Sequence, residues 1–152
     1  MALSTTSALA TPNSGVNCLP GSGTSIASVT GMSPAHRQDL IARALTFAHG
    51  TQVICRQLLK PGPLEAHIAV QLFKAASAIG PNLEEGQVGQ SRRDMGLKYA
   101  VALREAREAR HWFKLLEKDE TWRLPVRGLI AESEEFVAML TVSVRKLRSP
   151  LG

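Results

Sequence analysis

The pattern with the clearest chemical meaning is a single Glu-x-x-His, Glu108 to His111, within a segment of helical periodicity. Di-iron four-helix bundles use this pattern twice and add one glutamate from each of two further helices. Here it occurs once, the glutamates at 132–135 have no histidine beside them, and the other three histidines lack the spacing. We therefore expect neither a metal site nor a cofactor.

Nucleophilic and phosphate-loop chemistry are also disfavoured. Cys55 adjoins the apolar Ile54, which is typical of a buried small hydrophobic residue, and it lies far from Cys18, so no disulfide framework is indicated. Gly86 and Gly89 lack the strand and the lysine of a phosphate-binding loop. No apolar run approaches the ~20 residues that span a bilayer. We expect a non-catalytic, soluble protein of the reducing cytoplasm that does not bind membranes.

The basic residues are the better functional candidates. The chain carries a formal charge of +5 and has a pI near 9.7. Steps of three and four from Arg104 to Lys118 place five cations along one ridge of a helix, where they could follow a phosphate backbone. The alternative is a solvated face, because Glu105 and Glu108 are interleaved and Arg104 can pair with Glu108. The candidate nucleic-acid-binding residues are Arg92, Arg93, Lys98, Arg104, Arg107, Arg110, Lys114 and Lys118.

Composition divides the chain into two parts. Residues 1–32 contain no charged side chain and are rich in Ser, Thr, Gly and Ala, so we expect a disordered tail. One hypothesis is that translation begins at Met32. Residues 33–149 instead show helical periodicity throughout.

Four helices are expected in the second part. Ser33 and Pro34 are typical of a helix start, 61–63 should end that helix and open the next, and Ser91 with Asp94 forms a capping box for the third. The fourth should start between Thr121 and Pro125. The expected core stripes are Leu40, Ala44, Phe47, Thr51, Ile54 and Leu58; Ile68, Leu72, Ala75 or Ala76, Ile79 and Leu83; Met95, Tyr99, Ala102, Ala106, Ala109, Phe113 and Leu116; and Val126, Ile130, Ser133, Val137, Leu140, Val144 and Leu147. Short connections make neighbouring helices antiparallel, which predicts an all-α, up-down-up-down four-helix bundle.

The segment 71–116 carries an ordered set of short motifs: Gln71-Leu72, Lys74-Ala75-Ala76, Ile79-Gly80, Asn82-Leu83, Glu85-Gly86, Ser91, Asp94, the run 102–108, Trp112 and Leu115-Leu116. With these residues the segment resembles the four-helix-bundle proteins of the 23S ribosomal RNA intervening-sequence family, which includes relatives of the accessory protein of diversity-generating retroelements. The resemblance implies a non-enzymatic protein that assembles into a ring, with a homopentamer expected, and that associates with RNA or with a reverse-transcriptase or other ribonucleoprotein complex.

The chain departs from the family pattern at Lys74, Ala78, Glu84, Met95 and His111, where the family often has Arg, Ser, Ala, Phe and Tyr. Lysine cannot reproduce the bidentate contact of arginine, so a binding role at Lys74 does not transfer directly.

A second set of candidates is drawn from the matching residues and serves as a motif or interface set. These residues are Lys74, Asn82, Glu85, Gly86, Glu105, Glu108 and Trp112. Asn82 and Glu85 could form a polar subunit interface or bind an RNA edge, but we favour a role in satisfying backbone groups near Pro81. Trp112 could anchor a subunit contact or cover the end of the bundle. The alternative function is a protein–protein adaptor or scaffold with no nucleic-acid role.

Overall fold

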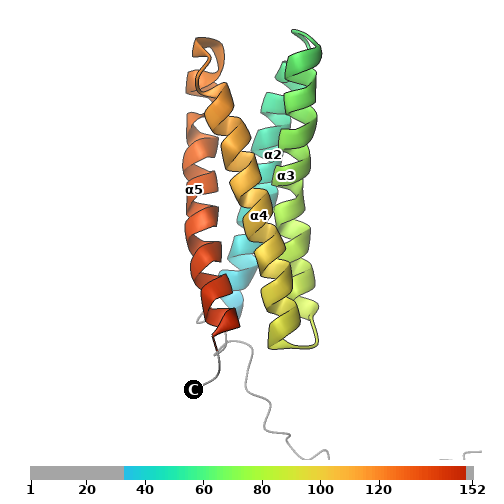
Figure 1. The fold of residues 1–152 in the computed structure, drawn as a ribbon, viewed down its shortest axis with the longest axis vertical. Helices are drawn as coiled ribbons and strands as arrows, with labels where there is room; N and C mark the ends of the chain where they lie inside the picture. Colours follow the sequence, from blue (N-terminus) through green and yellow to red (C-terminus); the bar gives the residue numbers. More distant parts are fainter. Residues whose placement is uncertain (1–32, 150–152) are drawn as a thin grey trace, which may run out of the picture.

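The computed structural model describes residues 33–149, so the predicted tail lies outside the described residues. Four helices follow one another: α2 (Pro34–Leu58), α3 (Pro63–Val88), α4 (Arg92–Leu116) and α5 (Glu120–Arg148). They run alternately up and down the long axis, and between residues 33 and 149 there is no strand (Figure 1). The predicted up-down-up-down four-helix bundle is confirmed.

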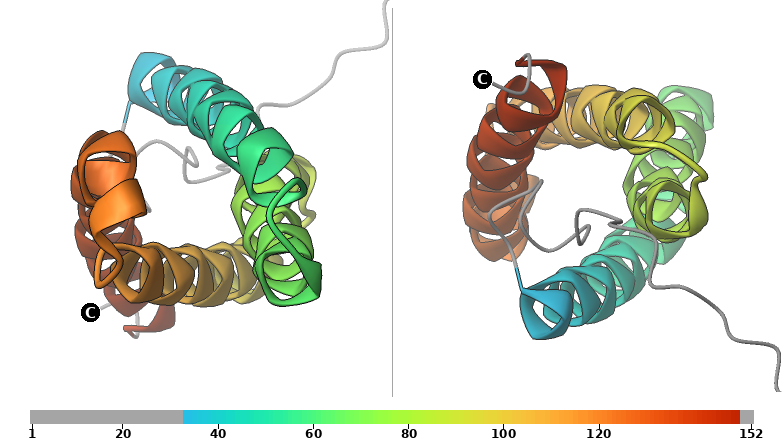
Figure 2. Two further views of the ribbon diagram at one scale, coloured as in Figure 1. Left: turned by 90° about the horizontal axis from the view of Figure 1, so that it is seen from above. Right: turned by 90° about the horizontal axis from the view of Figure 1, so that it is seen from below.

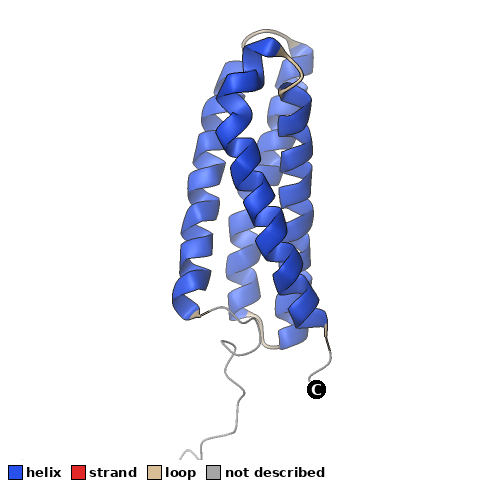
Figure 3. Cartoon of the chain, turned by 90° about the vertical axis from the view of Figure 1, so that its left-hand side faces the viewer, coloured by secondary structure: helices blue, strands red, loops and turns tan. Residues whose placement is uncertain are grey.

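The helices surround a single core in the order of the chain. Consecutive helices pack side by side. The first and last helices, α2 and α5, are also neighbours around the core, but they are in less extensive contact than any consecutive pair (Figure 2). Across that seam Arg43 holds Glu132 with two hydrogen bonds, Nε to Oε1 and Nη2 to Oε2, each of 3.0 Å. The connections lie at the two ends of the bundle, which leaves four long faces between helices (Figure 3).

Side-chain caps fix three of the four helix starts. Ser33 Oγ accepts the amide N–H of His36 at 3.2 Å, and Ser91 Oγ accepts that of Asp94 at 3.1 Å, as the sequence predicted. The predicted start of α5 is wrong: the helix begins at Glu120 because Asp119 accepts the N–H of Thr121 and acts as the cap. Pro125 is accommodated within the helix.

The predicted core stripes are buried with one exception on α5. There Val137 is only half-buried, and Phe136 takes the core position instead. The Phe136 ring packs 5.5 Å from that of Phe47, which in turn meets Phe113 edge-to-face at 5.9 Å. These three rings form the aromatic centre of the core.

Small residues bring α3 and α4 close together. Ala75 and Ala76 on α3 and Ala102, Ala106 and Ala109 on α4 are buried, and Gly86 lies directly beneath the ring of Tyr99. A Cβ at Gly86 would stand 2.8 Å from Tyr99 Cδ1, closer than carbon atoms approach, so glycine is required there by packing. None of the described helices is long and apolar enough to cross a membrane.

Candidate nucleic-acid interface

The predicted basic ridge of α4 is interrupted by ion pairs. Lys114 Nζ lies 2.7 Å from Glu134 Oε1 on α5, and Lys98 pairs with Glu85 on α3. Because the neighbouring helices supply these acids, both lysines already have a counter-charge. Of the predicted cations, Lys98 and Lys114 are thus the weakest candidates for phosphate contact.

Arg104 is also paired, but not with the predicted partner. Its Nε and Nη2 donate to Glu105 Oε1 at 3.2 and 2.7 Å, so the expected pairing with Glu108 is wrong. The reason is burial: the Glu105 side chain is nearly covered, and the guanidinium of its neighbour reaches back to neutralise it. This hydrogen bond is the main cause that raises the pKa of Arg104 above its usual value.

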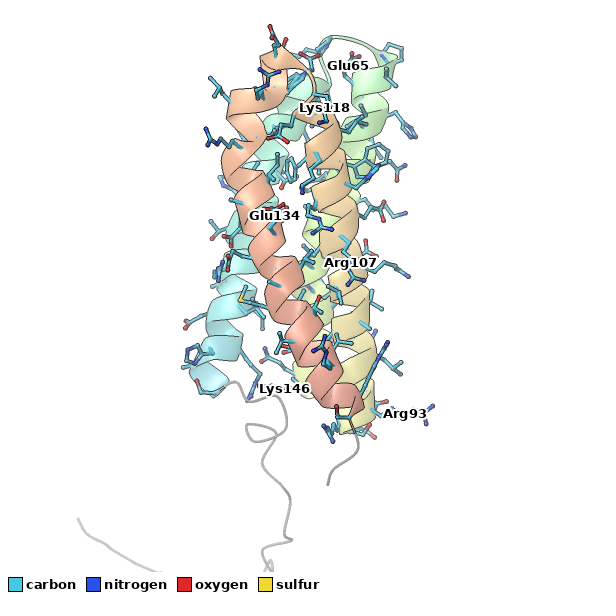
Figure 4. All side chains as sticks on the ribbon, turned by 60° about the vertical axis from the view of Figure 1, so that its left-hand side comes forward. Glu65, Arg93, Arg107, Lys118, Glu134 and Lys146 are labelled. Atoms are coloured by element: carbon cyan, nitrogen blue, oxygen red, sulfur yellow. The ribbon has the colours of Figure 1, made fainter. Side chains whose placement is uncertain are left out.

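Arg110 and Lys118 are set apart from the other predicted cations for different reasons. Arg110 is half-buried near Glu134, whose pKa is lowered mainly by its hydrogen bond with Lys114 and to a smaller extent by the charge of Arg110. Lys118 follows the end of α4 and lies at the far end of the bundle from Arg93 (Figure 4). The predicted set of eight cations therefore does not act as one continuous surface.

The remaining predicted arginines meet two further arginines from α5. A hollow of about 450 Å³ between α4 and α5 is lined by Arg107, Arg145 and Arg148. A second hollow of about 410 Å³ is lined by Arg92, Arg93 and, again, Arg148. Because Arg148 borders both, the two hollows adjoin. We call these five arginines and the hollows between them the basic groove.

The local sequence explains why the two helices meet here. Gly96 on α4 faces Leu147 on α5, and a Cβ at Gly96 would lie 3.4 Å from that of Leu147, at the limit of ordinary contact. Arg92 Nη2 donates to the backbone carbonyl of Lys146, which ties the start of α4 to the last turn of α5. The Arg92 Nε atom is buried and has no hydrogen-bond partner.

The groove keeps most of its positive charge because few acids adjoin it: Glu105 and Glu108 flank Arg107 in the sequence, but Glu105 is already paired with Arg104. Neither 95–104 on α4 nor 136–149 on α5 contains an aspartate or glutamate, and Asp94 is engaged with Ser91. Within the described chain, no carboxylate lies within ion-pair distance of Arg93, Arg107, Arg145 or Arg148. Figure 4 shows Arg93 and Lys146 at this end of the bundle, with Arg107 further along α4. Four guanidinium groups are thus available to an anionic ligand.

Arg145 and Arg148 are the functional candidates that the sequence did not single out. At the end of α5 they read as cations favoured by the helix dipole. Their position in the sequence could have indicated the site. Arg145 and Arg148 directly follow Val144 and Leu147, two predicted core residues, so they lie at the edge of the apolar stripe of α5. Recognising a shared site, however, requires knowing which helix lies alongside.

The predicted motif residues lie away from the basic groove. Asn82 Nδ2 donates to the carbonyl of Ala78 at 2.8 Å, Glu85 holds Lys98 across the α3–α4 face, and Gly86 packs against Tyr99. Each contact is within the subunit. Asn82 bonds a backbone carbonyl near Pro81, as we favoured, whereas Glu85 pairs with a side chain and satisfies no backbone group that the structure shows.

The other motif residues are less engaged. Lys74 is exposed on α3, and Glu108 is half-buried on α4. Trp112 is half-buried with its ring centroid 5.8 Å from that of His111, and its buried Nε1 atom has no hydrogen-bond partner. Glu105 and Trp112 share one side of α4 with Lys98, since all three are spaced by seven residues. Their predicted interface role stays a prediction.

Metal and thiol chemistry find no support between residues 33 and 149. No three His, Cys, Asp or Glu side chains in this range lie close enough together to hold a metal ion. Cys55 is a buried free thiol whose Sγ donates to the carbonyl of Ala69 at 3.3 Å. Burial raises its pKa to about 11, so it is protonated at neutral pH. The prediction that it acts as a buried hydrophobic residue is confirmed.

Comparison with known proteins supports the fold and, loosely, the family resemblance. No protein-family model matches the chain, and no curated protein is significantly similar to it. A solved structure from Bacteroides thetaiotaomicron VPI-5482, of a protein with unknown function from the S23 ribosomal protein family, is similar with a TM-score of 0.63 and 25% sequence identity. The alignment covers 72% of this chain and 97% of that one. The suggested relation to diversity-generating retroelements finds no support in these comparisons.

Proposed function

We propose that this chain is a non-catalytic, homo-oligomeric four-helix bundle that binds RNA through the basic groove between α4 and α5. The observation that carries the proposal is the gathering of five arginines from two helices, four of which have no ion-pair partner within the described chain. A guanidinium group is planar and donates two parallel hydrogen bonds, which suits the oxygens of a phosphate.

The dimensions of the groove fit a phosphate backbone. Arg93 and Arg107 are separated by fourteen residues of one helix, or about 21 Å at 1.5 Å per residue. Measured along the axis of a B-form duplex, that length corresponds to roughly six phosphates of one strand at 3.4 Å each. Arginines line this path from α4 on one side and from α5 on the other.

The groove offers no aromatic surface on which bases could stack. No aromatic residue lines either hollow, and Tyr99, Phe113 and Phe136 are fully buried in the core. Stacking of bases on aromatic rings, the usual mode of single-strand binding, is therefore unavailable there. The proposed binding is directed to the backbone and is independent of sequence.

The similar protein and the family resemblance make RNA the preferred nucleic acid. The similar structure belongs to a family named for a ribosomal protein. The resemblance further implies a pentameric ring that joins a ribonucleoprotein or reverse-transcriptase complex. A ring would present several basic grooves at once, and avidity would strengthen contacts that are individually weak.

The experiment is a titration of a 20-base-pair RNA duplex at several salt concentrations. Four arginines without a described partner predict that affinity falls roughly 50- to 150-fold between 50 and 200 mM salt. The double variant Arg145→Gln/Arg148→Gln should lower affinity at 50 mM salt at least about tenfold and reduce the slope of log K against log salt by about 1.8.

The matched control removes the same charge at the other end of the molecule. Arg56 and Lys60 are exposed near the end of α2, so Arg56→Gln/Lys60→Gln should leave most of the affinity and slope in place. Equal losses in the two double variants would show that net charge, and not the groove, governs binding. Absence of binding by the wild-type protein at low salt would refute the proposal.

A protein–protein adaptor is the second candidate function. It is favoured by large apolar side chains exposed on the opposite side of the bundle, on α2 and α3. An adaptor without a nucleic-acid role would show no salt-dependent RNA binding and no effect of the arginine substitutions.

A further inference from the structure

The face formed by α2 and α3 carries an unusual amount of exposed apolar surface. Leu45 is 73% exposed, Val70 58% and Leu59 56%, and Phe73 is also partly exposed. Helical spacing puts Leu45 and Leu59 on one side of α2, and Val70 and Phe73 on one side of α3. Scattered exposed hydrophobic residues are normal, but a contiguous set marks an interaction surface.

A groove runs along this face. It has a volume of about 610 Å³, and Leu45 and Phe73 stand on its opposite sides. Its lining includes the small residues Ala44, Ala48 and Gly80, which allow α2 and α3 to approach so closely that a Cβ at Gly80 would lie 3.7 Å from that of Ala44. Small residues between large ones form the kind of surface into which a side chain or helix of another molecule can pack.

The face is large enough for a stable contact. From Gln38 to Leu59 the chain rises about 32 Å, and two adjacent helices are roughly 20 Å wide. Their product, roughly 600 Å² before side-chain relief is counted, approaches the ~800 Å² that each partner buries in a standard interface.

The scarcity of charge on this face favours a second copy of the chain as the partner. Residues 44–55 of α2 contain no Lys, Arg, Asp or Glu, and between residues 66 and 83 of α3 the only one is Lys74. Glu84 adds one carboxylate to the lining of the groove. Arg43 is turned towards α5, where it holds Glu132. Two copies of a chain with a charge of +5 repel each other, so they can meet most easily through a face that is nearly uncharged.

The position of the face in the bundle is equally suitable. The helices follow one another around the core, so the α2–α3 face lies opposite the α4–α5 face that holds the basic groove (Figure 2). When the α2–α3 face packs against a surface of the next copy other than its α4–α5 face, every basic groove stays open to solvent. Such packing also keeps the arginines of different copies apart.

We infer that the α2–α3 face is a subunit interface at which a second copy of this chain packs over the groove between Leu45 and Phe73. The inference rests on the homo-oligomeric part of the proposed function and assigns it a surface. It assigns the α4–α5 face to the ligand and the α2–α3 face to assembly.

The test is the molar mass of the full-length protein, measured by light scattering after size-exclusion chromatography. The wild-type protein should be larger than a monomer, and Leu45→Glu, which places a charge in the contact, should weaken association at least tenfold. The matched control is Leu124→Glu on α5, where leucine is comparably exposed but lies outside the α2–α3 face. It should leave the mass unchanged, and circular dichroism should show the same helicity in all three proteins.

Two results would overturn the inference. A wild-type monomer would mean that the face is covered by something other than a second copy, such as another protein or residues 1–32. An oligomer that survives Leu45→Glu while Leu124→Glu dissociates would place the interface elsewhere. RNA titration separates this outcome from failure of the proposed function. Leu45→Glu should remove avidity but keep the arginine-dependent slope of log K against log salt. Arg145→Gln/Arg148→Gln should instead keep the molar mass of the oligomer.

Discussion

The contact between Gly86 and Tyr99 allows a sharp test of how closely α3 and α4 pack. In Gly86→Ala, the new Cβ would lie 2.8 and 2.9 Å from two carbons of the Tyr99 ring and 3.3 Å from Lys98 Cβ. Ordinary contacts begin near 3.4 Å, so the ring or the helix must move by more than half an ångström. Tyr99 is fully buried, which leaves the ring little room to yield.

Two opposing terms set the magnitude. Forcing an additional carbon into a packed interior costs about 1–3 kcal/mol. Replacing glycine by alanine within a helix recovers about 0.5–1 kcal/mol, and less near a helix end, where Gly86 lies. We therefore expect Gly86→Ala to lower the free energy of unfolding by roughly 1–2 kcal/mol.

A second glycine in the same protein provides the control. Gly128 lies within α5 with no atom within 4 Å of the position that a Cβ would take. Gly128→Ala should therefore raise the free energy of unfolding by about 0.5–1 kcal/mol. Both variants can be measured by urea denaturation followed by circular dichroism. If Gly86→Ala proves as stable as the wild-type protein or more so, the close approach of α3 and α4 is wrong.

Two further predictions concern the titrating groups. Burial raises the pKa of Cys55 to about 11, so the thiol contributes stability that is fully present below its unfolded pKa and is lost as pH rises towards 11. Between pH 8 and 10, the free energy of unfolding of the wild-type protein should therefore fall by roughly 1 kcal/mol more than that of Cys55→Ala. Urea titrations measure both changes, and equal losses would contradict the prediction. Glu134→Gln removes the ion-pair partner of Lys114, which lies two turns along α4 from Arg107, and should steepen the slope of log K against log salt for RNA binding by about 0.9. The control Glu135→Gln breaks no ion pair and should change this slope less. Equal changes in the two variants would argue against a local effect.

Helix positions were predictable because local chemistry determines them. Ser33 and Ser91 act as caps through hydrogen bonds to amides three residues away, so their effect is visible in the sequence. Asp119 was overlooked because Pro125 drew the expected start further along the chain. A proline within the helix costs one hydrogen bond, and the cap together with the buried Trp122 and Val126 outweighs it.

The position of Phe136 shows where periodicity becomes ambiguous. One turn of about 3.6 residues after Ser133 ends between Phe136 and Val137, so helical spacing places both residues at the border of the core stripe. Both residues are apolar, so the pattern alone could not distinguish them. The choice is made by Phe47 on α2, whose ring lies 5.5 Å from that of Phe136.

The candidate site was only partly predictable, because its charge depends on acids from other helices. Counting along α4 gives a continuous ridge of cations, but Glu134 of α5 takes up Lys114 and Glu85 of α3 takes up Lys98. The ridge keeps its charge only where the neighbouring segment is free of acids. On α5 that segment begins after Glu135, and it supplies Arg145 and Arg148 in addition.

The bundle has two chemically different faces. Cations without counter-charges gather between α4 and α5, while the uncharged stretch of α2 packs beside the apolar side of α3. Either property alone is common in a basic helical protein. Placed on opposite faces, they would allow the proposed assembly and the proposed RNA binding to proceed without competing for surface. A substitution on one face should therefore leave the other function intact, and this independence distinguishes a bundle with two functional faces from one whose charge and apolar surface are incidental.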